Sequence, residues 1–177
     1  MSVPTASEDY GVLKDERTLE IRRRLPGPIE RVWDYLADSD KRQRWLASGD
    51  MKGGTGAEFV LTWRNDELTD PPGSRPEGFS EGATMASRVV EFDPPHRLTF
   101  TWGESGTVTI QLSEAGEGVL LTLIHRGLAE RSTRVMVGAG WHIHLDILAA
   151  RLSGADPEPF WDGWVRLRSD YEARVPL

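Results

Sequence analysis

The chain has 177 residues and a formal net charge of −7, and 38% of its residues are hydrophobic. This balance predicts one globular domain, and the acidic total argues against a nucleic-acid-binding protein, which would present a basic face. The absence of cysteine excludes disulfides, zinc–thiolate sites and a cysteine nucleophile. No apolar run approaches the ~20 residues of a membrane helix and no signal-peptide pattern opens the chain, so we expect a cytoplasmic protein without membrane insertion.

A strand followed by two helices is predicted for the first part of the chain. Residues 1–16 are polar and are expected to form a flexible leader. Leu19, Ile21 and Leu25 lie at alternate positions of "RTLEIRRRL", which predicts a strand. The apolar residues of "PIERVWDYL" recur with helical spacing after Pro28, and "KRQRWLA" predicts a second, short helix.

Five more strands are predicted from segments rich in β-branched and aromatic residues. Their expected ranges are 57–63, 83–92, 98–102, 107–112 and 118–126. Short turns join the last four, so we expect an antiparallel meander. The segment 64–82 is rich in proline, glycine and charge, and we expect it to be a long, exposed and mobile loop near the mouth of a cavity.

Two helices are predicted near the C-terminus. In "GWHIHLDILAARLSG", Trp141, Leu145 and Leu148 fall on one helical stripe, and the helix is expected to end at Gly154. Residues 156–175 predict one more helix, whose apolar side carries Trp161, Trp164, Leu167 and Tyr171. This side must pack on the domain or on a second copy, which leaves open a homodimer through the C-terminal helix.

His142 and His144 raise the question of a metal site. Residues two apart on a helix diverge by about 200°, so the two imidazoles cannot bind one ion together. No other histidine pair or carboxylate cluster has ligand spacing, and we expect neither a metal nor a cofactor. His142 is expected to face solvent. His144 borders the apolar stripe, where it either bonds a neighbour or lines a pocket.

No catalytic motif is recognisable in the sequence. The chain has no nucleophile elbow, phosphate-binding glycine loop or dinucleotide fingerprint, and "GGTG" at 53–56 indicates a turn. His125 ends the apolar face of the strand at 118–126 and is expected to point inward. It is either a satisfied core histidine or a group that contacts a ligand or transfers a proton.

Four segments together resemble a known family. "PGPIERVWDYLADSDKRQRWLA" is similar to its opening helix pair, with Trp33 and Trp45 at familiar positions. "VVEFDPPHRLTFTW" resembles its strand–turn–strand, and "LTLIHRGL" and "GWHIHLDILAARLSG" resemble its last strand and closing helix. From about Thr18 to Gly154 the chain thus resembles the START-like (SRPBCC, birch-pollen-allergen-like) superfamily, in particular the subgroup named for the activator of heat-shock-protein-90 ATPase.

The resemblance implies an α+β helix-grip fold, in which a curved antiparallel sheet wraps around a long C-terminal helix and two short helices follow the first strand. We expect a flexible leader at 1–16, a START-like domain at 17–154 and a C-terminal helical extension at 155–177. Members form a cavity between the sheet and the long helix, and some bind lipids or polyketides while others are cyclases or hydroxylase components. The chaperone activators carry an extra N-terminal domain, which is not expected here.

The leading hypothesis is a protein that binds a small hydrophobic or aromatic molecule in this cavity. The expected ligand-binding residues come from the inward faces of the elements and are Trp33, Trp45, Phe59, Trp63, Arg88, Phe100, Trp102, His125, Trp141, His144 and Leu148.

Two alternatives remain from the sequence. One is a cyclase- or hydrolase-type enzyme that uses polar cavity groups, with His125 and an inward Arg88 or Glu91 as the candidates. The other is a chaperone-associated or homodimeric interaction protein. It would have a filled cavity and an exposed apolar patch formed by Phe160, Trp161 and Trp164.

Overall fold

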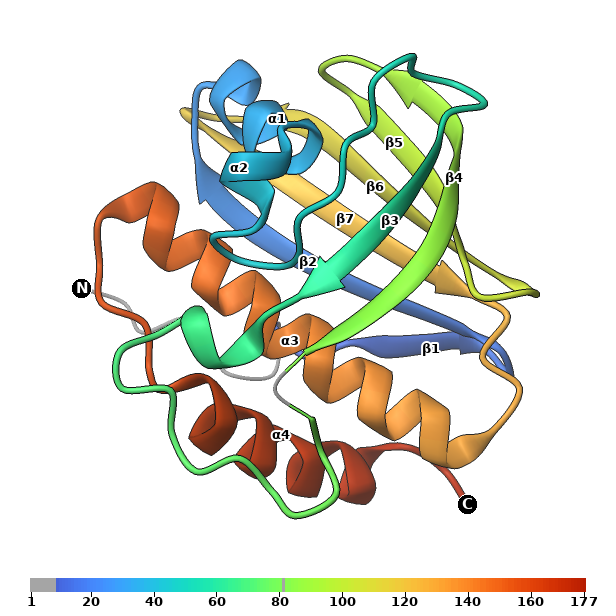
Figure 1. Ribbon diagram of the computed structural model, residues 1–177, viewed down its shortest axis with the longest axis vertical. Coiled ribbons are helices and arrows are strands. Elements are labelled where there is room, and N and C mark those ends of the chain that lie inside the picture. Colours follow the sequence, from blue (N-terminus) through green and yellow to red (C-terminus); the bar gives the residue numbers. More distant parts are fainter. Residues whose placement is uncertain (1–8, 81) are drawn as a thin grey trace.

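A curved antiparallel sheet wrapped around one long helix forms the body of the protein, as the computed structural model of residues 9–80 and 82–177 shows (Figure 1). The strands of these residues are β1 (Val12–Asp15), β2 (Thr18–Pro26), β3 (Glu58–Trp63), β4 (Ala83–Asp93), β5 (Arg97–Trp102), β6 (Gly106–Ala115) and β7 (Gly118–Arg126). Their order across the sheet is β1-β2-β7-β6-β5-β4-β3, and all neighbours are antiparallel. The expected α+β helix-grip fold is confirmed.

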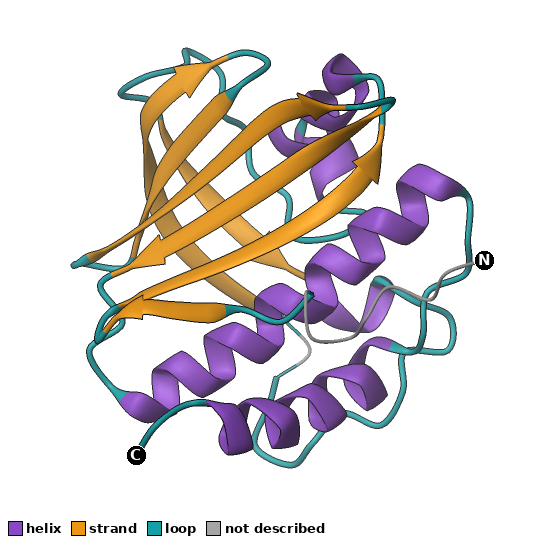
Figure 2. Cartoon of the chain, turned by 180° about the vertical axis from the view of Figure 1, so that it is seen from behind, coloured by secondary structure: helices purple, strands orange, loops and turns teal. Residues whose placement is uncertain are grey.

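Four helices and one short 3-10 helix accompany the sheet in the described part of the chain. They are α1 (Ile29–Ala37), α2 (Ser39–Arg42), the 3-10 helix η1 (Asn65–Glu67), α3 (Arg131–Ser153) and α4 (Phe160–Arg174). The first helix packs against β6 and β7, α3 crosses the concave face of the sheet next to β2, and α4 packs on α3 (Figure 2). No helix among these residues is both long and apolar enough to cross a membrane.

Side-chain alternation along the strands determines which residues enter the core. On β7, Leu121, Leu123 and His125 all point inward and are fully buried. The register pairs Leu123 with Ile110 and His125 with Val108 on β6, and both partners are buried too. These side chains form the part of the sheet on which α3 rests.

The N-terminal segment is more ordered than the sequence suggested. Residues 1–8 of the expected leader lie outside the described residues, but β1 lies within it and pairs with β2, for example through Leu13 and Leu19. The backbone N–H of Gly11 donates to the hydroxyl of Tyr171 at 2.7 Å. The expectation of a flexible leader is therefore wrong for Val12–Asp15, because an edge strand and a contact with α4 hold this segment.

The long helix α3 is buried on two opposite sides, because the sheet covers one and α4 covers the other (Figure 1). A helix that is covered in this way has no single polar face. His142 was expected to face solvent, and this is wrong: it is only 5% exposed. Its ring contacts Tyr10 and Tyr171, with ring centroids at 4.6 and 5.9 Å.

A polar network joins β2, α3 and α4 around His142. The guanidinium of Arg23, a buried residue of β2, donates to the carboxylate of Asp146 at 2.9 Å. The hydroxyl of Tyr171, which accepts a hydrogen bond from Gly11, is also hydrogen-bonded to Nδ1 of His142 at 3.0 Å. The pKa of His142 is lowered to about 3 by burial and, to a smaller extent, by the charge of Arg23.

The helix α4 uses its apolar side within its own chain. Trp161, Trp164, Leu167 and Tyr171 are all buried. A homodimer through the C-terminal helix would therefore have to use a different side of α4, and such a dimer stays a prediction.

The segment 64–82 is attached to the start of α4 rather than fully exposed as expected. Leu68 is 2% exposed, and the hydroxyl of Thr69 accepts from the backbone N–H of Phe160 at 2.9 Å. Trp161 donates its indole N–H to Asp66 at 2.7 Å and its backbone N–H to the carbonyl of Pro72 at 2.9 Å. These bonds make the described part of the loop and α4 one structural unit, while the mobility of the loop stays a prediction.

Candidate functional site

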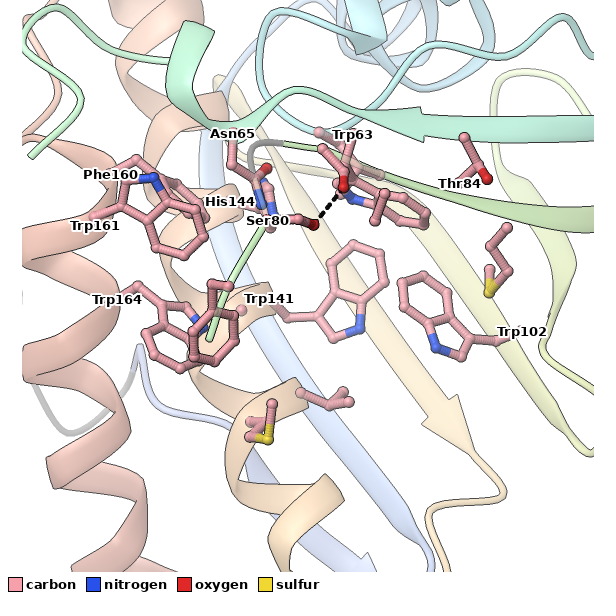
Figure 3. A pocket seen from close by; sticks show the side chains of 18 residues that line it. Trp63, Asn65, Ser80, Thr84, Trp102, Trp141, His144, Phe160, Trp161 and Trp164 are labelled. Carbon is pink, nitrogen blue, oxygen red and sulfur yellow. Dashed lines mark hydrogen bonds between the residues drawn. The ribbon is translucent and has the colours of Figure 1, made fainter. Parts of the chain in front are cut away.

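A pocket of about 500 Å³ lies between α3, α4, the segment 64–82 and the neighbouring ends of β3, β4 and β5 (Figure 3). Its volume falls in the range of small-molecule sites. Most of its lining surface is apolar, and the aromatic residues in it are Trp63, Phe79, Trp102, Trp141, Phe160, Trp161 and Trp164. The elements that meet here come from both halves of the chain, so the pocket exists only in the folded domain.

Three tryptophans from the sheet and α3 form one side of the pocket. The rings of Trp63 and Trp102 meet edge to face with centroids 5.5 Å apart, and Trp102 lies 5.4 Å from Trp141. Both strand residues stand at the C-terminal ends of their strands, where β3 and β5 reach the pocket. Such aromatic pairs add stability beyond the area that they bury, which favours a fixed orientation of the rings.

The loop and α4 provide the other side. The ring of Phe79 lies 4.9 Å from Trp164 and 5.9 Å from Trp161. Phe160 packs edge to face on Trp161 at 4.8 Å and also contacts the ring of His144 at 5.1 Å. An aromatic ligand that enters the pocket would thus have rings on both sides.

His144 is a buried polar residue of the pocket lining. Its Nδ1 lies 2.8 Å from the backbone oxygen of Trp45, and because a carbonyl only accepts, Nδ1 carries the proton. Burial lowers the pKa of His144 to about 4, although the bond to Trp45 acts in the opposite direction. At neutral pH the ring is therefore neutral, and Nε2 is a hydrogen-bond acceptor but a weak base.

Apart from the indole N–H groups of the tryptophans, the remaining polar groups of the described lining are the side chains of Asn65, Ser80 and Thr84. The described lining contains no lysine, arginine, aspartate or glutamate. Across residues 9–80 and 82–177, no group of three histidine, aspartate or glutamate side chains has a geometry that would hold a metal. The pocket is thus suited to uncharged ligands, and the sequence-based expectation of no metal or cofactor stays a prediction.

A family model for activator of Hsp90 ATPase homolog 1-like proteins matches residues 26–153. The chain belongs to this family. The solution structure of the protein encoded by the gene BPP1335 of Bordetella parapertussis is 38% identical, with a TM-score of 0.79, and the match covers 100% of this chain and 97% of that one. The resemblance to the START-like superfamily and its activator subgroup is therefore confirmed.

Two further solved structures show the same fold at lower identity. CalU16 from Micromonospora echinospora is 24% identical with a TM-score of 0.65, and the match covers 88% of this chain and 86% of CalU16. DynU16, from the dynemicin biosynthetic locus, is 20% identical with a TM-score of 0.64, and the match covers 80% of this chain and 49% of DynU16. The comparison with curated proteins gives no match.

Within this activator-homologue fold, the structure brings together four of the residues that were expected to bind a ligand. Trp63, Trp102, Trp141 and His144 all line the pocket. Five others lie in the hydrophobic core and not in the lining of this pocket: Trp33, Trp45, Phe59, Phe100 and Leu148. The inward direction of these five follows from strand and helix periodicity, but they are placed at other depths of the core.

His125 does not reach the pocket. It is fully buried behind two pocket residues, and its Nδ1 accepts a hydrogen bond from the indole N–H of Trp141 at 3.0 Å. Burial lowers the pKa of His125 to about 4. Its hydrogen bond therefore orients Trp141, and His125 is not among the residues that line this pocket, so a direct role in binding stays a prediction.

Arg88 was expected to point inward, and this is wrong. Val89 occupies the inward position on β4, so Arg88 points to the outer face and pairs with Glu58 across β3 at 2.9 Å. The side chain of Glu91 is about half exposed, and its carboxylate lies 3.6 Å from the guanidinium of Arg97. The polar combination suggested for an enzyme, His125 with Arg88 or Glu91, is therefore not assembled.

Several lining residues were not expected from the sequence, chiefly Asn65, Phe79, Phe160, Trp161 and Trp164. The apolar stripe of the C-terminal helix was recognised, but a stripe does not specify its packing partner. Phe79 is an aromatic residue in an otherwise polar segment, and that isolated position was the available signal that the loop is anchored.

Proposed function

We propose that this protein binds a small hydrophobic or aromatic molecule in the pocket between α3, α4 and the segment 64–82. The observation that carries the proposal is a 500 Å³ pocket whose described lining is mostly apolar, includes seven aromatic residues and contains no charged side chain. Apolar walls with a few polar groups are typical of small-molecule sites. The proposal includes the cytoplasmic location that the sequence predicts.

The two alternatives receive less support from the geometry. An acid–base enzyme needs polar groups that converge on one reacting atom, whereas His125 is outside the pocket and His144 is a weak base. An interaction protein was expected to have a filled interior and to expose Phe160, Trp161 and Trp164. Those residues are buried in the chain and line an open pocket.

The test combines two measurements. A native mass spectrum of freshly purified protein should show a bound small molecule, and calorimetry should detect binding of methoxynaphthalene, a neutral aromatic probe. Trp141→Leu, in the pocket, should weaken binding about tenfold because it removes stacking area. The matched control Trp33→Leu, in the core away from the pocket, should lower stability but change affinity less than twofold.

Two results would contradict the proposal. One is a protein that carries no co-purified molecule and binds no neutral aromatic probe. The other is an equal loss of affinity in both tryptophan variants, because this would trace the effect to stability rather than to the pocket.

A further inference from the structure

One nitrogen of a buried histidine in the pocket has no partner. His144 is 6% exposed and uses Nδ1 to bond Trp45. Its Nε2 makes no hydrogen bond with a described residue. In this tautomer Nε2 has a lone pair and no proton, so the ligand group that satisfies it is a hydrogen-bond donor.

Asn65 gives a second, independent indication of the same kind. It lines the pocket at the start of η1, and its Oδ1 is buried without a hydrogen-bond partner in the described part of the chain. Figure 3 shows the side chains of Asn65 and His144 at the same end of the pocket. An unpaired buried acceptor is costly, and a ligand donor removes that cost once the side chain of Asn65 turns Oδ1, which has almost no accessible surface, toward the pocket.

The third lining group at this end is also suited to accept. The hydroxyl of Ser80 donates its proton to the carbonyl of Gly82 at 2.5 Å, which leaves only lone pairs for a ligand. A carboxylate would bring further acceptors to this place. It would find no arginine or lysine in the described lining, in a chain of net charge −7.

We propose that the pocket selects neutral aromatic molecules that carry a hydrogen-bond donor, such as a phenol-type hydroxyl, over matching ethers and carboxylates. His144 and Asn65 are the residues that determine this selectivity, and the aromatic side chains hold the ring. This inference rests on the proposed function, because it specifies the ligand class of the same pocket.

The test compares naphthol, methoxynaphthalene and naphthoate, with the substituent at the same ring position, by calorimetry at neutral pH. Naphthol should bind about fivefold tighter than the ether, as expected for one net hydrogen bond. The additional methyl group of the ether favours burial, so apolar area cannot explain a preference for naphthol. Naphthoate should bind most weakly, because its carboxylate loses water without gaining a cation.

Two asparagine variants locate the effect. In His144→Asn the amide N–H₂ can still donate to Trp45, but no acceptor remains at the position of Nε2. The preference for naphthol, measured as the ratio of the two affinities in the same variant, should fall to about one. His142→Asn is the matched control, on the same helix and similarly buried but outside the pocket lining, and it should keep the preference.

The outcomes separate this inference from the proposed function. Equal affinity for naphthol and the ether, or tightest binding of naphthoate, would overturn the donor selectivity and leave the apolar pocket in place. Binding of none of the three would overturn both proposals. If His144→Asn does not fold, Asn65→Leu replaces it and should reduce the same preference, and an unchanged preference there would count against Asn65.

Discussion

The two sides of α3 place histidines of similar burial among different partners. On the side of Arg23 and α4, His142 has Nδ1 bonded to Tyr171 and Nε2 3.6 Å from Asp146. On the pocket side, His144 has Nδ1 bonded to Trp45, and its Nε2 has no hydrogen-bond partner among residues 9–80 and 82–177. At 3.6 Å Nε2 of His142 makes no hydrogen bond either, so neither burial nor an unused nitrogen distinguishes the two rings, and the difference is that His144 lines the pocket.

Acid should have the largest effect, because it acts on both sides at once. The pKa values of His142 and His144 in the folded protein are about 3 and 4, and that of His125 is about 4, against 6.5 for an ordinary histidine. Below about pH 6.5 the three histidines are therefore protonated in the unfolded chain while they stay neutral in the folded chain. Stability should be constant above that pH and fall by about 1.4 kcal/mol per pH unit for each histidine below it.

Urea unfolding at a series of pH values from about 7 to 5 checks this expectation. His142→Asn and His144→Asn should each remove about one third of the slope that the histidines cause. Equal reductions would show that burial, which the two sides share, determines the titration. A slope that neither variant changes would contradict the assignment to these histidines.

Arg23→Met should disrupt only the polar network around His142 and leave the pocket intact. The substitution leaves the carboxylate of Asp146 without its cation, and the free energy of unfolding should fall by about 2–3 kcal/mol. This is less than for a fully buried pair, because the Asp146 side chain is 36% exposed. Affinity for a naphthalene probe should change less than twofold, since Arg23 is not part of the pocket lining.

The control for this variant is Arg88→Met. Arg88 pairs with Glu58 at a similar distance, but both side chains are largely exposed, and the expected change is within about 0.5 kcal/mol. Similar losses in Arg23→Met and Arg88→Met would remove the distinction between the buried network and a surface pair.

Phe79→Ala should have the smallest effect on stability and should act on the pocket side. The ring is only partly buried, so the expected loss is about 1 kcal/mol, while methoxynaphthalene should bind about fivefold more weakly. Phe92→Ala is the control, because Phe92 is also partly buried and contacts Trp33 away from the pocket. Thermal unfolding measures the loss of stability in both variants, and calorimetry measures their affinity for methoxynaphthalene. Equal affinities of Phe79→Ala and Phe92→Ala would rule out a contact between Phe79 and the ligand.

The sequence predicted the fold better than the site, for a physical reason. Strand periodicity tells which face a residue occupies, and Phe59, Trp63, Phe100 and Trp102 do point inward. It does not tell how far along the strand the packed core gives way to a pocket. Only the two tryptophans at the strand ends line the pocket.

The position of α4 could not be predicted for a related reason. An amphipathic helix specifies which side is buried but not what covers it. Because α4 covers the second side of α3, His142 became buried, and Phe160, Trp161 and Trp164 became pocket residues. The sequence does not reveal that α4 packs on α3, and the wrong expectations about these residues follow from this.

The pocket is divided between two parts of the chain with different relations to the family. The family match covers residues 26–153, so the strands β3 to β7 and α3 belong to the shared part, whereas the 15-residue helix α4 lies beyond it. Substitutions at Phe160, Trp161 and Trp164 would therefore alter the walls of the pocket without changing strand register or α3. Because Thr69, Asp66 and Pro72 bond the start of α4, an exchange of α4 between homologues would have to include the segment 64–82 as well.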